Sequence, residues 1–522
     1  MAEEPVVDYA EFAKNIAESP VPEKATIRGQ IPEWLHGTLL RNGPGIFEIG
    51  PDKYKHLFDG LALIQRYQIE GGEVHYSTKY LRGKTYQRNM AAQRIIVSEF
   101  GTLAQPDLCK NIFSRYFSYY FPGEFTDNAL VNFMQSGDDI YAATETPLLV
   151  KIDKETLDVT DRVPVGKTFA VNTVTAHPHY DAHNIYNMGT GNRTYNIIRM
   201  PYRTGKDAIA QAEIAATIPI STPLNPSYYH SFGMTKSHVI FPEMPMKLSV
   251  FKLLTSALRK QPFSSSIAWN PALKTRIYLA DTEAKSVNPI VYTADPFFTF
   301  HHANAYEENG CVVTDFCAYT DGSVIESLNL EELRAGRLMA RNIEAFLWRM
   351  ILPMQIPTDA KAGDNLLESK WPETDAQAIL QVDGSVHVRP EKLCHQPFEF
   401  PRINYDMYNG RKYQFVYGTQ VFSENTETVF KVDVQNKSCM VWRREHSNQF
   451  AGEPVFVAKP NATQEDDGVV LVPVTSLKHS PFLLFLDAQS FEEIARAEVT
   501  AAIPISFHAH YVGAGTEPTL QQ

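Results

Sequence analysis

Short apolar or alternating runs recur along most of the chain, and each ends at a turn residue such as Gly, Asn or Asp. Runs of this length, rich in β-branched and aromatic residues, are typical of strands. The pattern predicts strands at many positions, among them 140–144, 149–153, 238–241, 276–279, 310–315, 428–433, 469–474 and 482–486. We therefore expect an all-β protein.

Helical periodicity is confined to four stretches, 9–17, 111–121, 246–260 and 330–341. They do not alternate regularly with the strands, as a βαβ architecture requires. No repeat of fixed period and no low-complexity linker divides the chain, so one domain over residues 1–522 is the simplest interpretation. The acidic run 465–468 lies between two predicted strands and ends in Gly, which favours a hairpin turn over a metal site.

Composition narrows the class of protein. The chain has 522 residues, 44% of them apolar, and a formal net charge of −12, which argues against nucleic acid as a partner. Five scattered cysteines without a CxxC pair indicate a reducing compartment. The sequence starts without the basic and apolar regions of a signal peptide and has no apolar run of about 18 residues. We expect a cytoplasmic protein.

Eight of the 16 histidines gather in four places. These are the segment 177–183 with three histidines, the single His230 with its apolar neighbours, the doublet 301–302, and the pair at 508 and 510. Each lies in or beside an apolar run, where a buried imidazole needs partners for its nitrogens. The groups are too far apart for a local zinc motif, so a shared metal site requires the fold to bring them together. A central axis ringed by inner strands would do this.

Other interpretations of these histidines stay open on spacing alone. They include purely structural roles, a propeller scaffold without catalysis, and a zinc hydrolase built on His177, His179 and His183. Pro178 and the strand-like flanks disfavour the helix that the last of these needs.

Ordered motifs along nearly the whole chain resemble those of the carotenoid cleavage oxygenases. The runs are 31–37 (IPEWLHG), 41–45 (RNGPG), 58–60 (FDG), 98–102 (SEFGT), 126–128 (TDN), 175–179 (TAHPH), 229–233 (YHSFG), 300–302 (FHH), 304–308 (NAYEE) and 465–468 (EDDG). The chain is most similar to the animal branch, which contains β-carotene oxygenases, an insect isomerooxygenase and a retinoid isomerase.

The resemblance implies a seven-bladed β-propeller with Fe²⁺ on its axis, under a cap of loops and short helices that covers an apolar tunnel. Carried over residue by residue, it implies the iron ligands and catalytic residues His177, His230, His301 and His508. Three acids would accept the outer N–H groups of ligating imidazoles: Glu145, Glu399 and Glu453. The implied tunnel residues are Phe100, Thr144, Tyr228, Tyr319 and Phe507.

The implied activity is that of a dioxygenase that cleaves a carotenoid double bond with O₂ to give retinal or another apocarotenoid aldehyde, at the central 15,15′ bond. The alternatives are a retinyl ester isomerohydrolase, which uses the same iron without oxygen, and a combined isomerooxygenase. No Rossmann or P-loop motif indicates another cofactor.

A carotenoid or retinoid substrate resides in membranes, so two amphipathic segments of the chain are candidates for contact with a membrane surface. We expect peripheral docking on a membrane surface through apolar residues between cationic or polar ones: Leu108, Cys109, Ile112, Phe113, Tyr116, Phe117, Phe251, Leu254 and Leu258. Cys109 is also a candidate for acylation. Two core-packing helices would produce the same periodicity.

Overall fold

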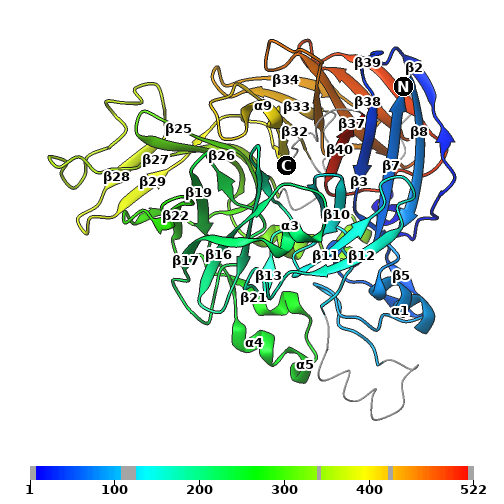
Figure 1. Cartoon of the computed structure of the whole chain (residues 1–522), viewed down its shortest axis with the longest axis horizontal. Coiled ribbons are helices and arrows are strands. Elements are labelled where there is room, and N and C mark those ends of the chain that lie inside the picture. Colours follow the sequence, from blue (N-terminus) through cyan, green and yellow to red (C-terminus); the bar gives the residue numbers. More distant parts are fainter. Residues whose placement is uncertain (1–6, 107–124, 338–342, 421–426, 515–522) are drawn as a thin grey trace.

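The structure, a computed structural model, describes residues 7–106, 125–337, 343–420 and 427–514. Its described strands form seven sheets of four to seven strands and two small two-stranded sheets. Figure 1 shows the sheets arranged around the middle of the molecule. The all-β class predicted from the strand pattern and the propeller implied by the family resemblance are both confirmed.

The first three sheets follow the chain closely, apart from one strand contributed by the C-terminus. In sheet order they are β1 (Glu23–Lys24), β8 (Glu73–Tyr80), β7 (Leu61–Glu70), β3 (Gly37–Arg41) and β40 (Ala509–Gly513), with β4 (Pro44–Ile46) beside β7; then β12 (Val159–Pro164), β11 (Leu148–Ile152), β10 (Asp139–Ala143) and β9 (Asn132–Ser136); then β13 (Thr173–Val174), β15 (Asn184–Thr190), β16 (Thr194–Pro201) and β17 (Glu213–Pro219), with β14 (His179–Tyr180) beside β15.

In the next two sheets, the strands formed by residues 286–392 are divided between both sheets, so the strand order does not follow the chain. One is β18 (Gly233–Met234), β19 (His238–Glu243), β22 (Thr275–Asp281), β24 (Tyr292–Ala294), β29 (Val386–Arg389) and β28 (Gln377–Leu380), with β23 (Ser286–Val287) beside β22. The other is β25 (Phe298–Glu308), β26 (Cys311–Tyr319), β27 (Phe346–Pro353) and β30 (Glu391–Lys392).

The last two large sheets and the two small ones complete the strand order. They are β31 (Glu399–Arg402), β32 (Phe415–Thr419), β33 (Glu427–Asp433) and β34 (Ser438–Arg443); then β2 (Thr26–Gly29), β39 (Glu493–Glu498), β38 (Phe482–Asp487), β37 (Gly468–Ser476) and β35 (Gln449–Ala451), with β36 (Val455–Ala458) beside β37; then β5 (Glu48–Ile49) with β6 (Asp52–Lys53), and β20 (Met246–Leu248) with β21 (Ile267–Trp269).

The two ends of the chain close the ring of sheets by pairing with distant partners. Strand β2 pairs with β39, where Ile27 lies opposite Ala497, and β40 pairs with β3, where Tyr511 lies opposite Leu39. In Figure 1 the blue N-terminal strands therefore lie beside the red C-terminal ones. Closure of the ring fixes the inner strands around a common axis and leaves only short sheet edges.

The inner strands are buried on both faces. Their sequences are therefore mostly continuous buried runs and do not alternate between apolar and polar residues. Eight successive residues of β37 are buried, and β25 buries its first nine residues, 298–306. Each of the eight predicted strands overlaps a strand of the structure, with ends that differ by at most a few residues. The run 465–468 ends the connection between the antiparallel strands β36 and β37, with Gly468 as the first residue of β37, in agreement with the predicted hairpin.

The helices are few and short, and they differ from the predicted ones. Those of the described residues are α1 (Lys84–Ala92), α3 (Lys206–Ala210), α4 (Val250–Leu254), α5 (Ser256–Arg259), α6 (Ser323–Ser327), α7 (Leu330–Arg334) and α9 (Tyr405–Tyr408), with the 3₁₀ turns η1 (Tyr9–Ala13), η2 (Leu57–Asp59) and η3 (Phe263–Ser266). The predicted helix 9–17 is only the turn η1. Of the helix predicted for 330–341, residues Leu330–Arg334 form α7, and 338–341 lie outside the described residues. The helix predicted for 111–121 lies outside the described residues.

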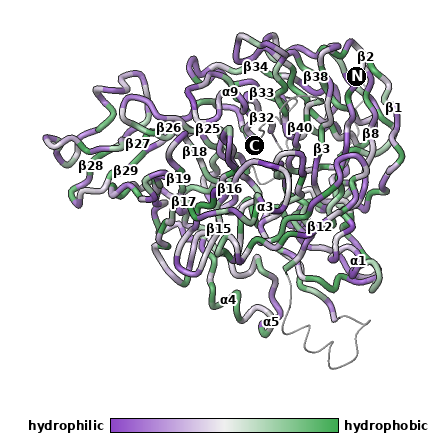
Figure 2. Tube along the Cα trace, in the orientation of Figure 1, coloured by the Kyte–Doolittle hydropathy of each residue, from purple (hydrophilic) through white to green (hydrophobic). Residues whose placement is uncertain are grey.

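The helix predicted for 246–260 is wrong over its first residues, 246–249, and the remainder is divided into two short helices, α4 and α5, by a break at Thr255. Residues Met246–Leu248 pair with β21 instead, and Ser249 then caps α4 by accepting the N–H of Lys252. No residue of α4 is buried, so this segment does not pack into the core. Figures 1 and 2 show α4 and α5 projecting from the sheets, with hydrophobic positions along them.

Candidate metal centre

Four histidines from distant parts of the sequence meet in one buried group. Their ligand nitrogens lie within 4.8 Å of one another: His177, His230, His301 and His508. The Nε2 atoms of His177 and His230 are 2.8 Å apart, and those of His301 and His508 are 3.2 Å apart. His177 and His230 lie two and three residues before β14 and β18, His508 lies directly before β40, and His301 lies inside β25, so four different sheets aim one imidazole each at the same point.

Burial favours the neutral form of three of the clustered imidazoles, those of His177, His230 and His508. It lowers the pKa of His508 to about 4 and the pKa of His230 below its usual value. For His177, burial lowers the pKa well below the usual range, and the neighbouring histidines add to the effect. A metal competes with a proton for the imidazole nitrogen, so a site of neutral rings is ready to bind one.

Three carboxylates lie behind the imidazoles and fix their orientation. The distances from Nδ1 to the carboxylate oxygen are 2.5 Å for His230–Glu145, 2.6 Å for His301–Glu399 and 2.9 Å for His508–Glu453. Each imidazole donates its Nδ1–H outward, which leaves the Nε2 lone pair directed at the centre of the group.

Glu453 is itself held in place. Its second oxygen accepts the N–H of Ala509 at 2.7 Å, and Arg402 lies 3.8 Å from its first. These donors lower the pKa of this fully buried acid against the cost of burial.

A bulge in β25 decides which histidine of the doublet enters the group. The pairing with β26 shifts register on both sides of His302. His301 faces the other three histidines, whereas His302 points away and its Nδ1 lies 2.9 Å from Ser231 Oγ. Adjacent strand residues point to opposite faces, so only one histidine of the doublet can enter the group.

The other clustered histidines have separate structural partners. His179 lies 3.0 Å from the hydroxyl of Tyr405, and the Nε2 of His510 lies 2.7 Å from Gln135 Oε1. His183 is exposed. The hypothetical zinc set of 177, 179 and 183 is therefore not brought together within the part of the chain that the structure describes.

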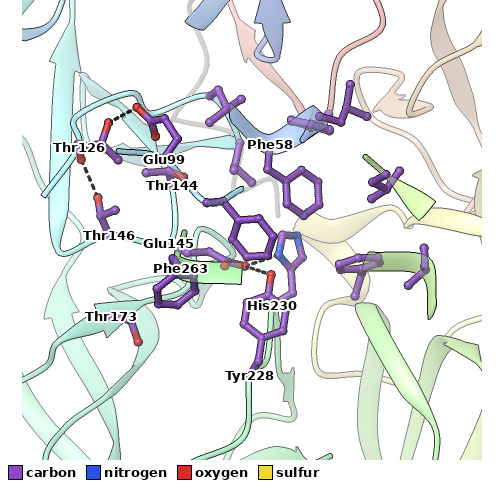
Figure 3. Close-up of a pocket in the computed structure, with 18 of the residues that line it drawn as sticks. Phe58, Glu99, Thr126, Thr144, Glu145, Thr146, Thr173, Tyr228, His230 and Phe263 are labelled. Atoms are coloured by element: carbon purple, nitrogen blue, oxygen red, sulfur yellow. Dashed lines mark hydrogen bonds and ion pairs between the residues drawn. The ribbon is translucent and has the colours of Figure 1, made fainter. Parts of the chain in front are cut away.

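The group opens onto a large cavity of about 970 Å³. All five predicted tunnel residues line it, as do His230, His301 and His508. Figure 3 shows Tyr228, Phe58 and Phe263 around His230. The Tyr228 hydroxyl also donates to Glu145 at 3.2 Å. A cavity of this size with aromatic walls is typical of a site for a large apolar ligand.

Several site residues were not predicted from the sequence. The ring of Phe400 packs against both His301 and His508, with centroid distances of 5.1 and 5.2 Å. Glu99 lines the cavity and accepts a hydrogen bond from Thr126 at 2.7 Å, and burial raises the pKa of this acid well above its usual value (Figure 3). Glu99 lies in the run 98–102 noted in the sequence analysis, and Phe400 directly follows the predicted acid Glu399.

The residues predicted to dock on a membrane divide into two sets. Phe251, Leu254 and Leu258 are 73%, 78% and 73% exposed. The remainder, Leu108, Cys109, Ile112, Phe113, Tyr116 and Phe117, lie outside the described residues. None of the described helices is both long and apolar enough to cross a bilayer.

The fold and the histidine group together define a class: an all-β propeller with a buried site that suits a metal ion, placed at the wall of a large apolar cavity. Four neutral imidazoles are a donor set that iron, zinc, copper and nickel accept. The family model described as retinal pigment epithelial membrane protein matches residues 12–513, and the chain belongs to this family, the carotenoid cleavage oxygenases.

The comparisons with individual proteins agree with this. The chain is 42% identical over 520 residues to mouse β,β-carotene 15,15′-dioxygenase, covering 96% of this chain and 91% of the relative. It is 40% identical over 523 residues to the mitochondrial carotenoid-cleaving dioxygenase of the ferret, Mustela putorius furo, covering 96% of each. A variant of the Synechocystis apocarotenoid oxygenase superposes with a TM-score of 0.76 at 22% identity, over 97% of this chain and 98% of that one.

Proposed function

We propose that this protein is a carotenoid dioxygenase that cleaves the central 15,15′ double bond of a carotenoid with O₂ to give retinal. The observation that carries the proposal is the group of four histidines at the wall of the large apolar cavity. The similarity to animal β,β-carotene 15,15′-dioxygenases over nearly the full chain supports the substrate and the position of cleavage.

The proposed metal ligands are His177, His230, His301 and His508, and the proposed ion is Fe²⁺. Neutral imidazoles suit iron, and Glu145, Glu399 and Glu453 bring negative charge close to a dication that four neutral ligands leave uncompensated. Bound there, iron would supply the position at which molecular oxygen is activated for cleavage of the double bond.

The chain's own contribution is to bind and orient the polyene. A carotenoid has almost no polar groups, so its binding relies on buried apolar area and aromatic contacts. We assign this role to the cavity residues Phe100, Thr144, Tyr228, Tyr319 and Phe507. A wall that holds one double bond beside the metal and excludes water favours one cleavage position over the others. The two oxygen atoms of O₂ then appear in the two aldehyde products.

Oxygen consumption coupled to bleaching of β-carotene tests this function. Iron-loaded protein should consume one O₂ for each β-carotene lost and form two retinal molecules, and the variant His230→Ala should do neither. Turnover of a retinyl ester under anaerobic conditions, with no oxygen uptake on carotenoids, would contradict the proposal and identify an isomerohydrolase instead.

We further propose that the whole chain, 1–522, is one domain and that each of the seven larger sheets is one blade of a seven-bladed propeller. The pairing of β2 with β39 and of β3 with β40 supports a single closed unit, because both ends of the chain take part in it.

The exposed apolar side chains of α4 and α5 support peripheral membrane docking of a cytoplasmic enzyme. Phe251, Leu254 and Leu258 stand among the exposed cations Lys252, Arg259 and Lys260. Apolar side chains that enter the acyl region, with cations near anionic headgroups, are the combination that holds a segment at a membrane surface. The nearby Leu253, Ser256 and Gln261 line the large cavity, so docking here would bring its wall close to the lipid.

A further inference from the structure

One buried acid on the wall of the large cavity takes no part in the metal centre. Among the described residues, four acids line this cavity. Glu145 and Glu399 accept the Nδ1–H groups of histidines, and Glu344 is half-buried. The fourth, Glu99, is 6% exposed and has no ion pair within the described part of the chain. Acids are almost never buried without a partner, so Glu99 is a candidate for a role toward a ligand.

The backbone and one carboxyl oxygen of Glu99 are held by neighbouring groups. Its N–H donates to the carbonyl of Thr102 at 2.9 Å, which fixes the backbone at this point. Its Oε1 accepts the hydroxyl of Thr126 at 2.7 Å, a bond that is drawn in Figure 3. The Thr126 oxygen in turn accepts the N–H of Asn128 at 3.1 Å, so the hydroxyl proton is directed to Glu99. The carboxyl group therefore has a defined orientation.

The second carboxyl oxygen of Glu99, Oε2, faces the cavity. None of the residues that the structure describes bonds to it. It is also not one of the side-chain atoms that the protein encloses without a partner. Since Glu99 lines the large cavity, Oε2 is accessible to a molecule bound there.

Burial favours the neutral form of this carboxyl group. It raises the pKa of Glu99 well above the usual value, and the nearby carboxylates of Asp59 and Asp127 add to the effect, against the hydrogen bond from Thr126. In its neutral form the acid carries one O–H. Because Oε1 is occupied as an acceptor, the proton lies on Oε2, where it can donate to an oxygen atom of a ligand.

Glu99 is separated from the histidine group by other side chains of the wall. The ring of the next residue, Phe100, has its centroid 6.2 Å from that of Tyr228, whose hydroxyl donates to Glu145. Glu145 then accepts the Nδ1–H of His230. Figure 3 likewise shows Glu99 apart from His230. A substrate with one double bond at the metal would therefore meet Glu99 at a point away from the bond that is cut.

We propose that Glu99 is a specificity-determining residue whose Oε2–H donates a hydrogen bond to a hydroxyl or carbonyl oxygen of the carotenoid substrate. The role rests on the proposed function, because it requires a carotenoid in the cavity. A hydrocarbon such as β-carotene leaves the donor without an acceptor in apolar surroundings, which is unfavourable. A site built to pair with a polar group discriminates against an analogue that lacks it, so oxygen-bearing carotenoids are the preferred class.

Binding measured without turnover tests this role. Under anaerobic conditions, quenching of tryptophan fluorescence in the iron-loaded full chain gives affinities for three probes: β-carotene, zeaxanthin with its two ring hydroxyls, and 8′-apo-β-carotenal with its aldehyde. For at least one oxygen-bearing probe, the affinity relative to β-carotene should be about tenfold higher in the wild-type protein than in Glu99→Leu. Glu99→Gln retains an N–H donor and should keep most of the preference. The two oxygen-bearing probes show whether a hydroxyl or a carbonyl is the acceptor.

The matched control is Glu344→Leu, which removes the half-buried acid of the same wall and should keep the affinity ratios of the wild-type protein. A purely structural role of Glu99 would change the affinities for all three probes by the same factor. Equal ratios in the wild-type protein and in Glu99→Leu, for both oxygen-bearing probes, would overturn the proposal. Glu99→Met serves the same comparison if Glu99→Leu does not fold.

Oxygen admitted to the same samples separates this proposal from the proposed function. Probes that bind with the expected ratios but are not cleaved would contradict the dioxygenase activity and still support the hydrogen bond from Glu99. Probes that are cleaved, with ratios that Glu99→Leu leaves unchanged, would support the activity and overturn the role of Glu99.

Discussion

Each of the three acids behind the histidines selects one tautomer of an imidazole. Because Nδ1 donates outward to Glu145, Glu399 or Glu453, Nε2 is left free to bind a metal at the centre. The predicted set of histidines and acids depended on the family resemblance. Spacing alone left His177, His179 and His183 as a competing set, and only the fold separates them. Phe400 adopts a positive φ of 52° beside Glu399, which no sequence pattern indicated.

Replacing Glu453 by glutamine should weaken metal binding about 10- to 100-fold. The amide nearly preserves the shape of the side chain but removes the negative charge that holds His508 and balances the metal. A competition titration with a chelator of known affinity measures this effect directly. The exposed Glu373→Gln is the control and should bind as the wild-type protein does. Equal affinities for Glu453→Gln and the wild type would contradict the proposed role of this acid.

His56 should make the protein less stable in acid. Burial lowers its pKa from 6.5 to about 4, while its Nε2 contacts the carbonyl of Ile325 at 2.8 Å and its Nδ1 accepts the N–H of Phe58. Below pH 6.5 the unfolded chain takes up a proton that the folded chain does not, so stability is lost as the pH falls from about 6.5 toward 4.

The loss through His56 is about 2 kcal/mol between pH 7 and pH 5, at 1.36 kcal/mol for each pKa unit. In His56→Gln, urea unfolding should show a drop between these pH values that is smaller by about this amount than in the wild-type protein. Identical drops in the two proteins would mean that His56 titrates normally in the folded state.

At the scale of elements, strands were predicted better than helices, for a physical reason. A buried strand carries its own signal in a short apolar run, as in β37 and β38. The helices depend on contacts from elsewhere in the chain. The first two N–H groups of α1, at Lys84 and Thr85, bond to the carboxylate of Asp127, more than 40 residues away. This long-range cap, and a helix with only Thr85 and Asn89 buried, left no local pattern to detect.

The segment formed by α4 and α5 should bind anionic vesicles. Replacing Phe251, Leu254 and Leu258 together by serine should lower the fraction of protein that sediments with phosphatidylserine-containing vesicles about tenfold or more, because the apolar area that enters the bilayer is lost. Added salt should weaken the binding of the wild-type protein as well.

The control for vesicle binding replaces exposed apolar residues that lie elsewhere. Val21 and Val382 are 76% and 95% exposed, and the double variant Val21→Ser, Val382→Ser should sediment like the wild-type protein. If the triple variant in α4 and α5 also sediments like the wild-type protein, this segment is not the docking surface.

The whole molecule depends on contacts between the two ends of a 522-residue chain. Pairing of Leu39 with Tyr511, and of Ile27 with Ala497, closes the ring and sets the inner strands at fixed angles around one axis. The sequence contains no periodic repeat from which these partners could be read, so the strand pattern predicted an all-β fold but not its pairing. Closure is also what brings His508 to residues more than 200 positions earlier in the chain.

Metal content measured by mass spectrometry tests most directly whether these four histidines hold a metal. The wild-type protein loaded with iron should retain one iron per chain after gel filtration, and His177→Ala should lose most of it. His510→Ala is the matched control, a buried histidine that is bonded to Gln135 and lies outside the group, and it should retain iron. Iron at one per chain in His177→Ala, or zinc in place of iron in a wild-type protein that does not take up iron, would contradict the proposed iron centre.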